Sequence, residues 1–159
     1  MLRQSGRVLI AVLSVFLWTC VPVAAQMTHP VTNLGDGGMG SGSLRNAILA
    51  LTATNDIIRF NVPGGGTVTL LSALPQITHN NLTIDGTNNG DSISINGGGS
   101  RQIFSFGSPV YFLTLNDLTL QNGSASQGGA INFTEMIGAT TLTYGGDMQF
   151  INNTATGSG

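Results

Sequence analysis

Short apolar runs that alternate with Ser, Thr and Asn fill most of the chain after residue 56. Each run covers three to six residues and ends at Gly, Pro, Asn or Asp, the residues that turns favour. The pattern predicts strands over residues 57–62, 67–71, 82–84, 93–95, 103–106, 112–115, 118–120, 130–133, 140–144 and 148–151. Strands so short and so numerous are typical of a sandwich, a barrel or a β-solenoid.

One segment follows helical spacing instead. A helix is predicted for residues 43–52, with Ser43 as a favourable N-cap residue. Its apolar face consists of Leu44, Ala47, Ile48 and Leu51. In the preceding segment, residues 26–42, the stretch 35–42 is so rich in glycine that we expect no regular structure in it.

An internal repeat distinguishes between the three β architectures. Residues 118–126 align on residues 148–156 with a period of 30 residues, so that Asn122 falls on Asn152. A weaker alignment places residues 81–86 on residues 117–120 at a spacing of 36. Solenoids repeat in this way because each coil lies on the one before it, with inward apolar rows and stacked asparagines at the turns. The sequence therefore predicts an all-β chain that winds as a β-helix.

The N-terminus has the three parts of a secretory signal peptide. Arg3 and Arg7 precede an apolar run, residues 8–18, and small residues lead to a cleavage site expected after Ala25. Two alternatives remain open at this point. The longer apolar stretch from Val8 to Ala25 is near the lower length limit for a membrane anchor, and the residues before Cys20 resemble a lipobox.

The composition excludes nucleic-acid binding and, after cleavage, a disulfide-dependent fold. Charged residues make up only 8% of the 159-residue chain, and its five basic residues are scattered arginines, which excludes the basic stripe of a nucleic-acid-binding protein. Cleavage after Ala25 removes Cys20, the one cysteine, so the mature domain cannot depend on disulfides.

Two sets of motifs resemble known protein families. Gly128-Gly129-Ala130-Ile131, followed by a segment from Phe150 to Asn153, resembles the paired GGA[ILV] and FxxN motifs of chlamydial-type polymorphic outer membrane proteins. Upstream, a second motif resembles the GSLRxAI segment that caps the first coil of many large secreted bacterial β-helix proteins. In this chain its residues are Ser43, Leu44, Arg45, Ala47 and Ile48.

The resemblance implies a right-handed parallel β-helix of the pectin-lyase-like type with a short N-terminal capping helix. It divides the chain into a signal peptide (1–25), a glycine-rich segment (26–42) and a β-helix (43–159) expected to be the N-terminal fragment of a longer solenoid. The implied function is adhesin-like display at a bacterial surface or outside the cell, as in an autotransporter passenger. The implied partners are ligands or glycans of a host or neighbouring cell, with further coils downstream and no mature transmembrane helix.

Each motif also has an expected local role. Gly128 and Gly129 suit a tight left-handed turn, after which Ala130 and Ile131 begin the next strand with a small inward side chain. In the FxxN motif, Phe150 is expected to point into the core. Asn153 is expected to sit at a turn and to hydrogen-bond the backbone through its side chain.

No catalytic, cofactor-binding or metal-binding residues are predicted. Asp85 and Asp117 do not align on one face, the arginines have no evident carboxylate partner, and His29 and His79 are expected at solvated or turn positions. The alternative function is the N-terminal part of a polysaccharide lyase or glycoside hydrolase, whose β-helices carry clustered acids. A purely structural stalk is a third possibility.

Overall fold

The computed structural model describes residues 25–52, 54–109, 112–134 and 139–157. The predicted signal peptide lies almost wholly outside this range. The described chain has one helix, α1 (Leu44–Leu49). Its strands are β1 (Thr28–Val31), β2 (Ile57–Phe60), β3 (Gly66–Thr69), β4 (Leu82–Asp85), β5 (Ile93–Asn96), β6 (Phe104–Phe106), β7 (Phe112–Asn116), β8 (Leu118–Gln121), β9 (Ser124–Ala125), β10 (Ile131–Phe133), β11 (Thr141–Gly145), β12 (Gln149–Ile151) and β13 (Thr154–Ala155).

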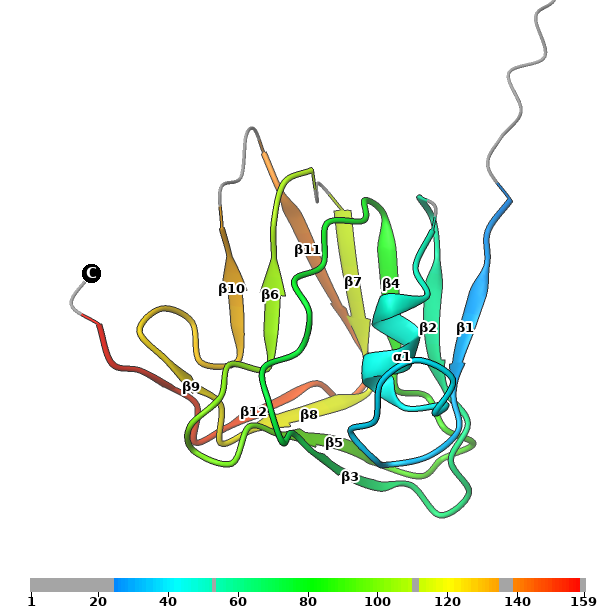
Figure 1. The fold of residues 1–159 in the computed structure, drawn as a ribbon, viewed down its shortest axis with the longest axis horizontal. Coiled ribbons are helices and arrows are strands. Elements are labelled where there is room, and N and C mark those ends of the chain that lie inside the picture. The colour runs from blue at the N-terminus through cyan, green and yellow to red at the C-terminus, as the bar shows by residue number, and fades with distance from the viewer. Residues whose placement is uncertain (1–24, 53, 110–111, 135–138, 158–159) are drawn as a thin grey trace, which may run out of the picture.

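The strands stack into parallel sheets that form the walls of a solenoid (Figure 1). Sheet A has the order β1-β2-β4-β7-β11, and sheet B has the order β12-β8-β5-β3. A third wall contains β6 and β10, and a short pair joins β9 to β13. Every pairing between these strands is parallel. The chain makes about four turns, and residues that pair on successive turns are between 25 and 31 positions apart in the sequence. The predicted right-handed parallel β-helix is confirmed.

The 30-residue repeat is also confirmed as a structural period. β12 lies on β8 with Gln149 beside Thr119, and β13 lies on β9 with the same offset. The alignment at a spacing of 36 is wrong, because β4 pairs with β7 and not with β8. The confusion arises because β7 and β8 both read Leu-Thr-Leu and present the same alternation as β4.

All ten predicted strands are present, and three further strands were not expected. β1 lies ahead of the glycine-rich stretch 35–42, in a part of the chain for which no strand was predicted, and Val31 in it is fully buried. β9 and β13 are two residues long, too short to produce an alternating pattern.

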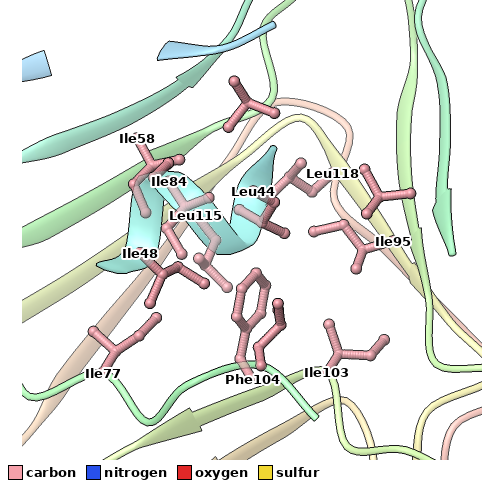
Figure 2. Packing of buried hydrophobic residues seen from close by; sticks show 14 of the residues in the cluster. Leu44, Ile48, Ile58, Ile77, Ile84, Ile95, Ile103, Phe104, Leu115 and Leu118 are labelled. Atoms are coloured by element: carbon pink, nitrogen blue, oxygen red, sulfur yellow. The ribbon is translucent and has the colours of Figure 1, made fainter. Parts of the chain in front are cut away.

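The core consists of inward side chains stacked in rows along the solenoid axis. In sheet A, one row contains His29, Ile58, Ile84, Leu115 and Tyr144. In sheet B, a matching row contains Val68, Ile95, Leu120 and Phe150. Figure 2 shows side chains from α1 and from the walls, among them Ile48, Ile84 and Phe104, pointing into one shared space. Burial of these rows is the main favourable term in folding.

Tight corners between the strands are made by residues with positive φ. Asn122 and Asn152 both adopt the left-handed conformation, with φ of 52° and 53°, one period apart. Asn tolerates this conformation better than other residues that carry a side chain. The amide of Asn122 donates to the carbonyl of Ile151, so the corner of one coil is tied to the next at 2.9 Å.

Helix α1 covers the first end of the stack. Ser43 is its N-cap, and its hydroxyl accepts a hydrogen bond from the Asn46 amide at 3.1 Å. The predicted apolar face is confirmed, since Leu44, Ala47, Ile48 and Leu51 are buried against β1 and β2. Within the described part of the chain, no helix has the length and apolar character needed to cross a membrane.

The inward rows predict that alanine substitutions at inward and outward positions of one strand differ sharply in their effect on the free energy of unfolding. Leu115→Ala removes a fully buried side chain from β7 and leaves a cavity, so we expect a loss of about 2–5 kcal/mol in the free energy of unfolding. Thr114→Ala changes the outward neighbour, and we expect a loss below about 1 kcal/mol. Urea denaturation followed by circular dichroism measures both, and equal losses would contradict the inward placement of Leu115.

Candidate functional site

The GGAI motif forms a corner where backbones meet closely. Gly128 has φ of +54°, and a Cβ atom there would lie 2.1 Å from the carbonyl oxygen of Ile131. A Cβ atom on Gly129 would lie 2.5 Å from the carbonyl oxygens of both Gly123 and Thr154. Both positions therefore need glycine.

The next two residues of the motif lead into β10. Ala130 is buried, and its carbonyl oxygen accepts the Phe104 amide at 2.9 Å. Ile131 begins β10 in register with Phe104 and packs against the core. The small Ala130 and the branched Ile131 thus connect the corner to the wall formed by β6 and β10.

The FxxN motif lies against the same corner from the following coil. The Asn153 side chain accepts the Gly123 amide at 2.7 Å and donates to the Leu120 carbonyl at 2.8 Å. Its expected role, hydrogen bonding to the backbone, is confirmed. Because Gly123 also contacts Gly129, the two motifs meet in space at one residue that neither contains.

Phe150 takes the inward register that was expected, directly beyond Leu120. Its side chain is nevertheless 47% exposed, because no described strand lies on the outer side of β12. The ring contacts Tyr144 edge-on, with a centroid distance of 5.7 Å.

Arg45 of the GSLRNAI segment forms an ion pair with Asp36 that was not predicted from the sequence. Arg45 forms two parallel hydrogen bonds to Asp36, at 2.9 and 2.8 Å, and donates to the Ser72 and Ala73 carbonyls. The Asp36 side chain is only 1% exposed and also accepts the Leu71 amide. The pair fastens the glycine-rich segment and α1 to the loop after β3. Arg59 likewise pairs with Asp85, so the expectation that the arginines lack carboxylate partners is wrong for Arg45 and Arg59.

The two histidines also differ from expectation. His29 lies in β1 and is buried, with its Nε2 atom 3.0 Å from the carboxylate of Asp56. Asp56 in turn accepts the Met27 and Thr52 amides. This pair is internal to the first coil, and the prediction of a solvated His29 is wrong. His79 is half-buried.

A polar depression lies at the corner between sheets A and B. It has a volume of about 270 Å³ and is lined mainly by hydroxyl, amide and carboxylate side chains. Its polar side chains are those of Thr87, Asn88, Asp91, Ser92, Asp117, Thr119, Asp147 and Gln149. We call this depression the polar hollow. No lysine or arginine lines it.

Asp117 organises the polar hollow. It has φ of 50° at the corner between β7 and β8, and its carboxylate accepts the Asp147 amide and the Thr87 hydroxyl, each at 2.8 Å. These hydrogen bonds favour the ionised form and hold the pKa of Asp117 below its ordinary value. The carboxylate is therefore an ionised hydrogen-bond acceptor.

The grouping of Asp117 with Asp147 was not predicted from the sequence, where Asp117 was compared with Asp85. Asp117 and Asp147 are one 30-residue period apart, so the confirmed repeat already placed them on adjacent coils. Asp85 instead ends β4, where it accepts the Thr87 amide, in keeping with the turn residues expected where strands end.

Outward side chains of sheet B continue the polar hollow as an uncharged surface. The first outward row contains Thr67, Ser94, Thr119 and Gln149, and the second contains Thr69, Asn96, Gln121 and Ile151. Successive members of each row are about 4.8 Å apart, the spacing of neighbouring strands. Among the described residues, no three His, Cys, Asp or Glu side chains are grouped so that they could hold a metal ion.

Comparisons with protein-family models, with curated proteins and with solved structures return no significant match to this chain.

The close packing at the motif corner predicts that one added methyl group at Gly129 lowers the free energy of unfolding. In Gly129→Ala, the added Cβ atom meets two carbonyl oxygens, so we expect a loss of about 1–3 kcal/mol in the free energy of unfolding. Gly38→Ala is the matched control, because no heavy atom lies within 4 Å of its added Cβ atom. Thermal or urea unfolding compares them, and a stable Gly129→Ala protein would contradict the corner geometry.

The Arg45–Asp36 pair predicts a dependence of stability on pH. Burial raises the pKa of Asp36, but hydrogen bonds from Arg45, Leu71 and Ser72 outweigh it and hold the pKa below the ordinary value of 3.8. The pair therefore contributes fully at neutral pH, and its contribution disappears as the pH falls through the lowered pKa. Asp36→Asn should cost about 3–5 kcal/mol at neutral pH, because it leaves the Arg45 charge without its partner.

Urea denaturation of wild type and variant tests this at a series of pH values. The difference between Asp36→Asn and wild type should shrink once the pH is below 3.8. Asp91→Asn, a change of an exposed acid, should cost less than about 1 kcal/mol throughout. A difference for Asp36→Asn that stays constant with pH would contradict a role for the Asp36 charge.

Proposed function

We propose that this chain is a secreted or cell-surface β-helix protein that displays a ligand-contacting face, in the manner of an adhesin passenger, without catalysis of its own. The observation that carries the proposal is the uncharged outward surface of sheet B, which runs into the polar hollow. Regular rows of hydroxyl and amide groups on a rigid support are suited to contact rather than to chemistry. The motif resemblance to polymorphic outer membrane proteins and the predicted signal peptide support the location.

The polar hollow favours neutral, hydroxyl-rich ligands such as glycans. Carboxylates accept hydrogen bonds from sugar hydroxyls, and Thr119 and Gln149 add groups of both polarities. Three acids, Asp91, Asp117 and Asp147, line the polar hollow without a compensating cation, so a polyanionic chain would be repelled.

The alternative is the N-terminal part of a polysaccharide lyase or glycoside hydrolase, and the same three acids are the observation that favours it. A hydrolase of this kind needs one carboxyl group that keeps its proton, which requires a raised pKa. Asp117 has a lowered pKa and donors on its oxygens. A lyase needs a base near the acids, whereas Arg45 and Arg59 are committed to ion pairs elsewhere. The display function is therefore preferred.

Binding of the full chain to a panel of neutral and acidic glycans tests the proposal. We expect binding to neutral glycans, weakened about thirtyfold by the double change Asp147→Asn with Gln149→Ala, since each of the two lost hydrogen bonds is worth about 1 kcal/mol. Thr83→Ala, an outward change on β4 away from the polar hollow, is the control and should bind as wild type does.

Three outcomes would contradict the proposal: absence of binding, a preference for acidic glycans, or equal binding by the double variant and wild type. Release of new chain ends from the glycan would instead establish the enzyme alternative. Measurement of reducing ends and of unsaturated ends on the same samples separates hydrolase from lyase activity.

A further inference from the structure

The chain contains three Asn-Gly pairs, Asn89-Gly90, Asn96-Gly97 and Asn122-Gly123, and the fold holds them differently. An asparagine followed by glycine is chemically reactive, because the backbone nitrogen of the glycine can attack the side-chain carbonyl carbon of the asparagine. Glycine has no side chain to hinder this approach and the widest freedom of φ. Whether a pair reacts in the folded protein therefore depends on how firmly the two reacting groups are held.

Asn96-Gly97 is held by hydrogen bonds at both reacting groups. The Asn96 side-chain oxygen accepts the Gly98 amide at 2.9 Å and the side-chain amide of Asn122 at 3.2 Å. The Gly97 amide donates to the Gln121 carbonyl at 2.9 Å. Attack within this pair requires these hydrogen bonds to open first.

Asn122-Gly123 is held in the same way at the corner of the next coil. The Asn122 side chain donates to the side-chain oxygen of Asn96, and the Gly123 amide donates to the side-chain oxygen of Asn153 at 2.7 Å. Both hydrogen bonds connect one coil to another, so the stack of coils keeps this pair from reacting.

Asn89-Gly90 lies instead in the loop between β4 and β5. The two residues have φ of 54° and 93°, as in a type I′ turn, and the Asp91 amide closes this turn by donating to the Asn88 carbonyl at 2.9 Å. Both are exposed, and a Cβ atom on Gly90 would have no heavy atom within 4 Å apart from its chain neighbours. Within the described part of the chain, neither the Asn89 side chain nor the Gly90 amide has a hydrogen-bond partner.

We propose that Asn89 is a site of spontaneous deamidation in the folded protein. The Gly90 backbone nitrogen forms a bond to the side-chain carbonyl carbon of Asn89, and the side-chain amide leaves as ammonia with the proton from that nitrogen. The product is a cyclic imide. Water, the only other reactant, opens the ring at either carbonyl and leaves an aspartyl or an isoaspartyl residue at position 89.

The modification changes the rim of the polar hollow. Asn89 lies between Asn88 and Gly90, which both line the hollow, and the new carboxylate adds negative charge beside Asp91. An isoaspartyl residue also lengthens the backbone of the turn that positions Asp91. We therefore expect ligand binding in the polar hollow to weaken as the product accumulates. This effect on binding rests on the proposed function, whereas the modification itself does not.

Peptide mapping by mass spectrometry tests the site after incubation of the folded protein at mildly alkaline pH. We expect Asn89 to react about thirtyfold faster than Asn96 or Asn122, since two hydrogen bonds of ordinary strength must open at each of those pairs. In urea, which removes the fold, all three pairs should react at similar rates. Equal rates in the folded protein, or an unmodified Asn89, would overturn the proposal.

Asn89→Gly is the matched variant, because a Gly-Gly pair suits the same turn and carries no side-chain amide. Binding of neutral glycans should fall during incubation in the wild type and stay constant in Asn89→Gly. An equal fall in both proteins would overturn the effect on the polar hollow. Fresh protein that binds no glycan would contradict the proposed function instead, and the mass measurement would still decide whether Asn89 is the modified residue.

Discussion

The structure depends on the stacking of inward apolar rows from one coil to the next. A single coil of this chain has little interior, since its short strands enclose only the side chains of their own inner faces. Burial becomes complete only when the coil above and the coil below are present, as for Ile84, which lies between Ile58 and Leu115. Stability is therefore a property of neighbouring coils together, as in other repeat proteins.

Stacking imposes a second requirement at the corners, where the chain must turn without losing its register. Asn122, Asn152 and Gly128 meet it by adopting positive φ, and Asn153 ties one corner to another through its side chain. This explains the abundance of glycine and asparagine, which would otherwise indicate disorder. The paired GGA and FxxN motifs act at the same corner. The glycines of the first allow the backbones to approach closely, and Asn153 of the second forms hydrogen bonds to the backbone there.

The fold could be predicted because alternation and turn residues are local signals. The repeat then selected a solenoid. Register was less predictable, since β7 and β8 share one pattern and the turns vary in length. The ion pair between Arg45 and Asp36, and the burial of His29, depend on contacts between segments that no spacing reveals. Of the candidate site, the grouping of Asp117 with Asp147 was predictable from the 30-residue period, whereas Asp91 enters the polar hollow only through the path of a loop.

The central claim is that β12 lies on β8 in the 30-residue register. Paired cysteines test it directly, because neighbouring strands are about 4.8 Å apart, within the reach of a disulfide. In a Cys20→Ser chain, Thr119→Cys with Gln149→Cys should oxidise readily to an intrachain disulfide, seen as a mass loss of two hydrogens. Thr83→Cys with Thr119→Cys, which a 36-residue register would bring together, should stay reduced because β4 and β8 belong to different sheets. The opposite result would contradict the account.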